Sequence, residues 1–167
     1  PPRYTRGGSS AASDVYKRQP LQAAVDAGIT IITVDTFLGD GDYVNGPVTF
    51  PLSYIGSDNV EGGRIAGYAL AETLGGKGKV YVQNTNVGVS TTEQRGQGFI
   101  EAISEFPDME LVGMDYNLDD ASTSAAQTSA VIQREPELAG IFGVNDFRAL
   151  RAGNAVKTAG LGGALVV

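Results

Sequence analysis

Residues 78–106, GKVYVQNTNVGVSTTEQRGQGFIEAISEF, carry the pattern that decides the fold. The segment KVYV at residues 79–82 predicts a strand. Ser90 and Glu93, three residues apart, fit the capping box that opens a helix. The apolar face of this helix would consist of Phe99, Ile103 and Phe106. A strand followed by a capped amphipathic helix is the repeating unit of parallel α/β proteins.

The same alternation extends over the chain from residue 20 onward. Strands are predicted at residues 29–34, 79–82, 109–114, 139–144 and 164–167. Helices are predicted at 21–27, from Asp58 to the Gly75-Gly76 pair, from Ser90, at 120–135, and from Asn145 or Asp146 to Gly160. Short links between such units imply right-handed crossovers. We therefore predict an α/β fold with a doubly wound parallel sheet.

Two details of this pattern predict burial. The continuous apolar run at residues 29–34 is typical of a strand that is buried on both faces. In the helix after Asp58, the predicted apolar stripe consists of Ile65, Ala69, Leu70 and Leu74.

Composition excludes several classes of function. The net charge of -7 argues against a nucleic-acid or anionic-membrane partner, because both favour basic patches. The chain has no cysteine and no histidine, and therefore lacks disulfides, thiolate metal sites and the commonest general base. We expect neither a cofactor nor a bound metal.

Residues 1–19 differ from the rest of the chain. They hold four of the twelve basic residues and a single acid, Asp14, and show no helical or strand period. We predict a non-native or disordered leader and exclude it from the fold.

In doubly wound sheets, ligands bind beyond the carboxyl ends of the strands. The polar residues expected there are Asp35, Thr36, Asn84, Thr85, Asn86, Asp115, Tyr116, Asn117, Asn145 and Asp146. Acids and amides predominate in this set, and they suit hydroxyl groups better than phosphate.

Three motifs have ordinary explanations. The GGKGK segment at 75–79 lies between a helix and the next strand, whereas a phosphate loop runs from strand to helix. RGQG at 95–98 is part of a dinucleotide fingerprint but lies inside a helix. The acidic turn at 40–42 lacks the other ligands of a calcium loop.

Two carboxylates and one arginine remain as candidate functional residues. Asp35 and Asp146 form the one obvious carboxylate pair, although Asp146 also suits a helix cap. Arg95 falls in the first turns of a helix, where a cation opposes the helix dipole. Either a salt bridge or a ligand would explain that position.

Eight segments resemble, in order and in spacing, the periplasmic sugar-binding proteins of the ribose and galactose type. They are AGI (27–29), TVD (33–35), IGSDN (55–59), GGRIAG (62–67), GGKGKV (75–80), RGQGF (95–99), IFGVND (141–146) and KTAG (157–160). Together they cover residues 21–167.

The resemblance implies the type I periplasmic binding protein fold, in which two α/β lobes joined by crossing strands close on a ligand. Residues 20–57 would form the end of an incomplete first lobe and the hinge crossing. Residues 58–167 would form most of the second lobe, truncated at its C-terminus.

The resemblance also implies a binding site. Asp35 would accept hydrogen bonds from sugar hydroxyls, and Ser57 would supply a hydroxyl at the hinge edge. Arg95 would donate from the second lobe, and Asn145 would both donate and accept. Asn86 is similarly placed near a ligand-contacting loop of the family.

Asp119 falls in another ligand-contacting loop of the family, by a looser match.

Micromolar affinity corresponds to about -8 kcal/mol, and a charge-assisted hydrogen bond contributes about 1.5–3 kcal/mol. The few site residues present cannot supply that total once association entropy is subtracted. We therefore expect this fragment to bind its ligand weakly or not at all.

The implied function is the substrate-binding component of a carbohydrate ABC transporter. Such a protein is a monomer without enzymatic activity that binds a small sugar or polyol and delivers it to a membrane ABC permease. It lies in the periplasm or outside the cell, lipid-anchored in some hosts.

The effector-binding domain of a LacI-type regulator shares the fold, but residues 1–19 supply no helix-turn-helix. A small enzyme on a flavodoxin-like layer is the third alternative, disfavoured by the lack of histidine.

Overall fold

The computed structural model describes residues 11–158, 160 and 164–167 of the chain. The elements are α1 (Ala11–Asp26), β1 (Ile32–Val34), β2 (Ser53–Ile55), α2 (Asn59–Thr73), β3 (Lys77–Asn84), α3 (Ser90–Ser104), β4 (Asp108–Tyr116), α4 (Ala121–Arg134), β5 (Leu138–Gly143), α5 (Asp146–Thr158) and β6 (Leu165–Val166). They form two compact units. Unit 1 runs to Ser57 and includes Val87–Thr91, and unit 2 comprises Asp58–Asn86 and Thr92–Val167.

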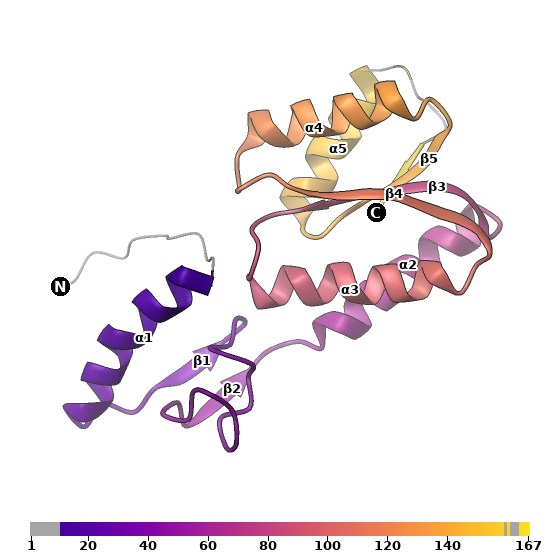
Figure 1. Ribbon diagram of the computed structural model, residues 1–167. Helices are drawn as coiled ribbons and strands as arrows, with labels where there is room; N and C mark the ends of the chain where they lie inside the picture. The colour runs from indigo at the N-terminus through magenta and orange to yellow at the C-terminus, as the bar shows by residue number, and fades with distance from the viewer. Residues whose placement is uncertain (1–10, 159, 161–163) are drawn as a thin grey trace. The chain divides into compact units, whose positions relative to one another are not determined.

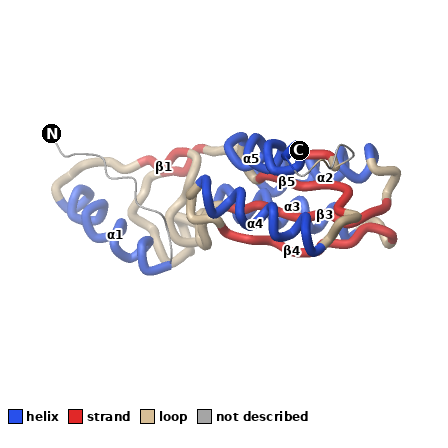
Figure 2. The backbone as a smooth tube through the Cα atoms, turned by 90° about the horizontal axis from the view of Figure 1, so that it is seen from above, coloured by secondary structure: helices blue, strands red, loops and turns tan. Residues whose placement is uncertain are grey.

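Unit 2 is built on a sheet of four parallel strands in the order β4-β3-β5-β6. Helices α2 and α3 cover one face of this sheet, and α4 and α5 cover the other (Figure 1). Seen from above, α4 and α5 lie over neighbouring parallel strands (Figure 2). This arrangement confirms the predicted α/β class with a doubly wound parallel sheet.

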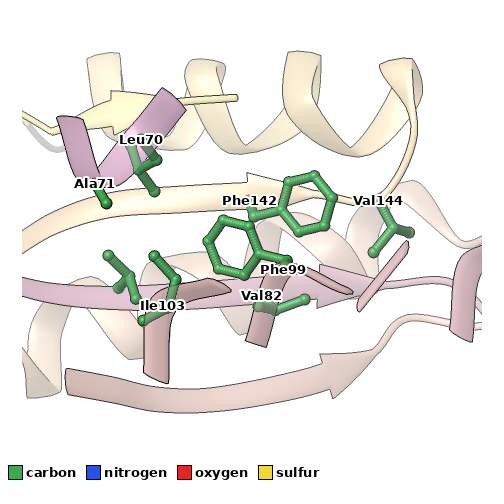
Figure 3. Close-up of a cluster of buried hydrophobic side chains, with 8 residues drawn as sticks. Leu70, Ala71, Val82, Phe99, Ile103, Phe142 and Val144 are labelled. Atoms are coloured by element: carbon green, nitrogen blue, oxygen red, sulfur yellow. The ribbon is translucent and has the colours of Figure 1, made fainter. Parts of the chain in front are cut away.

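The core of unit 2 has a layer on each face of the sheet, because alternate residues of β3 point to opposite faces. Val80 and Val82 join Leu70 of α2 in the first layer. Phe99 of α3 stacks there on Phe142 of β5, with ring centroids 4.4 Å apart and planes 10° apart (Figure 3). The second layer lies under α4 and α5 and consists of Tyr81, Val131, Ile132, Leu138, Ile141, Ala152 and Val156.

Two predicted helix starts are confirmed by their caps. The Asp58 carboxylate accepts the N–H of Glu61 at 2.9 Å, and the Asp120 carboxylate accepts the N–H of Thr123 at 2.7 Å. The hydroxyl of Ser122 and the N–H of Thr123 lower the pKa of Asp120 to about 2, so this cap is ionised at neutral pH.

The buried face of α2 differs from the predicted stripe. Ile65 is 60% exposed and Ala69 is exposed, whereas Gly63 and Gly67 are buried with Leu70. A Cβ on Gly63 would lie 2.0 Å from the carbonyl oxygen of Arg95 on α3. The glycines therefore let α2 approach α3 more closely than apolar side chains would allow.

Unit 1 corrects the prediction for residues 29–34. β1 pairs in parallel with β2 alone, and Ile29, Ile32 and Val34 are 49–68% exposed. The apolar run does form a strand, but burial on both faces requires neighbouring layers. In the described chain, the loop after β1 contacts one face of the strand through the Thr33–Tyr43 hydrogen bond, whereas Ile32 and Val34 on the other face stay exposed.

Helix α1 also begins earlier than expected, at Ala11 and not at residue 21. Residues 11–19 of the predicted leader are therefore helical, although Pro20 lies inside the helix and cannot donate a backbone hydrogen bond. Residues 1–10 lie outside the described residues, and the origin of the leader stays a prediction. Among the described helices, none is both long and apolar enough to cross a bilayer.

Candidate functional site

The carboxyl ends of β3 and β5 mark the topological switch point of unit 2. From β3 the chain continues to β4 on one side, and from β5 it continues to β6 on the other. In sheets of this kind a crevice for ligands opens where the chain direction reverses. Asn86 follows β3, and Asn145 follows β5.

Arg95 lies in the second turn of α3 and reaches this edge of the sheet. Its Nε donates to Oδ1 of Asn59 at 2.9 Å, and its Nη1 donates to the carbonyl oxygen of Val144 at 3.1 Å. The bonded groups are an amide and a carbonyl, so the ion pair considered from sequence is not what holds Arg95. Its positive charge remains without a carboxylate partner among the described residues.

Asn145 is next in sequence to Val144 and therefore lies close to Arg95. Its Oδ1 accepts the backbone N–H of Arg148 at 3.1 Å, so Asn145, and not Asp146, caps α5. The same side chain keeps an amide N–H₂ that can donate to a ligand. Asn86 is half-buried in the loop after β3. The structure thus brings Arg95 and Asn145 to one edge of unit 2.

Asp35 and Ser57 belong to unit 1, where each follows a strand of the β1–β2 pair. Asp35 has a left-handed backbone with φ of 67°. Its N–H donates to Ile55 at 2.9 Å, and its carbonyl accepts the hydroxyl of Tyr54 at 2.8 Å. The carboxylate is exposed and forms no ion pair among the described residues. A single site built from residues of both units stays a prediction.

Several polar residues at the strand ends serve the interior and not a ligand. Gln83 is fully buried, and its Oε1 accepts from Asn117 and from Ser124, each at 2.7 Å. Its Nε2 donates to Tyr81 and to Gln127. The expectation that Asn117 is available at the sheet edge is therefore wrong, because a buried amide requires partners and finds them here.

Asn84 is likewise fully buried, and its Nδ2 donates to the carbonyl of Thr92. Asp115 accepts the hydroxyl of Tyr81 at 3.0 Å. Burial raises the pKa of Tyr81, and burial together with Glu93 raises the pKa of Tyr116 to about 12. The two tyrosines therefore stay neutral at physiological pH, and Asn84 and Asp115 are engaged by partners within the protein.

The acidic turn at residues 40–42 is organised by its own backbone. Asp40 accepts the N–H of Asp42, and Asp42 accepts the N–H groups of Val44 and Asn45. These backbone bonds lower the pKa of Asp42. No cluster of three or more candidate metal ligands occurs among the residues that the structure describes.

Sequence reasoning missed Arg148, which lies in the first turn of α5. Its side chain is 4% exposed and pairs with the carboxylate of Asp119. The signal that singled out Arg95, a cation near a helix N-terminus, applies equally to Arg148.

Comparison with known proteins gives the family. Residues 10–167 match the family described as periplasmic binding protein domain. The chain belongs to this family. It is 31% identical over 147 residues to the ribose import binding protein of Salmonella typhimurium, covering 88% of this chain and 47% of that protein. It is also 31% identical to a D-apiose import binding protein of Actinobacillus succinogenes, covering 95% of this chain and 48% of the relative.

Comparison with solved structures points to the same family. An ABC transporter solute-binding protein of Agrobacterium vitis bound to α-D-tagatopyranose is 52% identical, with a TM-score of 0.81, over 85% of this chain and 48% of that one. A periplasmic solute-binding protein of Actinobacillus succinogenes with bound D-allose is 34% identical, with a TM-score of 0.76, over 87% and 51%. The chain spans about half the length of the curated relatives it matches.

Proposed function

We propose that this chain is part of the substrate-binding component of a carbohydrate ABC transporter. The observation that carries the proposal is the 52% identity to a solute-binding protein that was solved with tagatose. Relatives at about 31% identity are named as import binding proteins for ribose and apiose. These names favour a transport protein over both an enzyme and the effector domain of a LacI-type regulator.

The residues of the candidate site suit a sugar. A sugar hydroxyl both donates and accepts, so its recognition needs acceptors and donors together. We assign the acceptor role to Asp35, the donor role to Arg95, and mixed roles to Ser57, Asn86 and Asn145. The uncompensated charge of Arg95 strengthens a hydrogen bond to a ligand oxygen.

The partners follow from this role. The ligand is a small sugar or polyol, and the bound protein presents it to a membrane ABC permease. The protein works as a monomer in the periplasm or outside the cell, where a lipid anchor would retain it in some hosts. The acidic balance of the chain, with a net charge of -7, gives no support to a nucleic-acid partner.

A thermal-shift screen of the full-length protein tests the proposal. We expect at least one of D-tagatose, D-allose and D-ribose to raise the melting temperature, because a ligand at 100 times its dissociation constant adds about 2.7 kcal/mol to the stability of the protein that binds it. Amino acids at the same concentration serve as the control. If no sugar or polyol stabilises the protein, the carbohydrate function is wrong.

A further inference from the structure

We propose that Arg148 and Asp119 form a second recognition pair of the sugar site, which binds two adjacent oxygens of the ligand and helps to set its specificity. This inference rests on the proposed function. Both residues belong to unit 2. In the proposed contact Asp119 accepts from one hydroxyl, and the Arg148 guanidinium donates to the neighbouring oxygen.

Arg148 carries unused donors in a buried position. Its side chain is 4% exposed, and its Nε is buried without a hydrogen-bond partner among the described residues. A guanidinium has five N–H donors, and the described side-chain contact of Arg148 is the one from Nη2 to Asp119. An unpaired buried donor is costly, and an oxygen-rich ligand that reached the guanidinium would offset that cost.

The position of Arg148 is unfavourable for a purely structural cation. It stands in the first turn of α5 and reaches the residue before the N-cap of α4. Both helix N-termini carry partial positive charge. The cap itself, Asp120, is engaged by Thr123 and Ser122, which leaves Asp119 to balance the guanidinium.

Asp119 is exposed and held in a strained loop. Its side chain is 67% exposed. Leu118 and Asp119 have φ of 54° and 62°, and with Asp35 they are the non-glycine residues with positive φ in the described chain. All three follow the carboxyl end of a parallel strand. Such strain clusters at ligand-binding sites, where the surroundings enforce it.

The buried network described above enforces this strain. The N–H of Leu118 donates to the carbonyl of Thr85 at 2.8 Å, and the N–H of Asp119 donates to Oδ1 of Asn117 at 3.2 Å. Asn117 is itself fixed by Gln83. The network therefore fixes the backbone from which the Asp119 carboxylate extends, which reduces the cost of ordering this loop around a ligand.

Calorimetry on the full-length protein tests the pair. Arg148→Met and Asp119→Asn are titrated with D-tagatose, D-allose and D-ribose. We expect each variant to lose at least tenfold in affinity for the sugar that the wild-type protein binds most tightly. The ratio of this affinity to the affinity for the second-best sugar should change by at least threefold. Arg151→Met, the same change at an exposed position of α5, is the control and should stay within about twofold.

The outcomes separate the alternatives. If Arg148→Met and Asp119→Asn keep the wild-type affinities and ratios within about twofold, the pair joins α5 to the loop before α4 and does not recognise the ligand. Should Arg148→Met fail to fold, the exposed Asp119→Asn variant decides alone. If the wild-type protein binds no sugar, the proposed function fails and this inference falls with it.

Discussion

Replacing Phe99 by alanine is expected to lower the free energy of unfolding by about 3–5 kcal/mol, because it leaves a cavity in a fully buried layer. Phe99 stacks on Phe142 and so joins α3 to the central sheet (Figure 3). Urea unfolding of the full-length protein, followed by far-ultraviolet circular dichroism, measures the effect.

Ile65→Ala is the matched control for Phe99→Ala. Ile65 lies on α2, belongs to the same unit and is 60% exposed, so its removal should change stability by less than about 0.5 kcal/mol. Equal losses in the two variants would contradict the packing described for unit 2.

Replacing Arg95 by methionine is expected to weaken sugar binding by about tenfold to hundredfold. A charge-assisted hydrogen bond contributes about 1.5–3 kcal/mol, and each 1.4 kcal/mol corresponds to about tenfold in affinity. The guanidinium has no carboxylate partner among the described residues, so a ligand oxygen competes with no internal ion pair. Isothermal titration calorimetry with the sugar that stabilises the wild-type protein most measures the loss.

Two variants separate ligand binding from structure at Arg95. Asn59→Ala removes the oxygen that accepts the Nε hydrogen bond and keeps the guanidinium, so it should weaken binding less than Arg95→Met. Arg64→Met removes a cation that pairs with Glu61 and Glu101 on the helix surface and should leave affinity unchanged. Wild-type affinity in Arg95→Met would remove this residue from the site.

The order of elements in unit 2 could be predicted because each carries its own local signal. Helices α2 and α4 start where the sequence predicts them, and Asp58 and Asp120 are their N-caps. Phe99 and Ile103 form the buried face of α3 that their spacing predicts. Such signals act within a few residues, so they can be read from a single sequence.

Burial and pairing across the chain could not be predicted in this way. Gly63 and Gly67 are buried in place of Ile65 because backbone approach, and not hydrophobicity, decides the α2–α3 contact. Asn117 is withdrawn from the sheet edge by Gln83, a partner 34 residues away. Arg148 shares the position near a helix N-terminus that singled out Arg95, but its 4% exposure and its pairing with Asp119 depend on contacts that the sequence does not reveal.

A crystal structure of the full-length protein with a captured sugar is the most direct test of a carbohydrate site built from Asp35, Ser57, Asn86, Arg95 and Asn145. We predict that one sugar molecule lies within hydrogen-bond distance of all of these side chains. A sugar bound elsewhere, or a structure in which the five side chains lie on unconnected surfaces, would contradict the account.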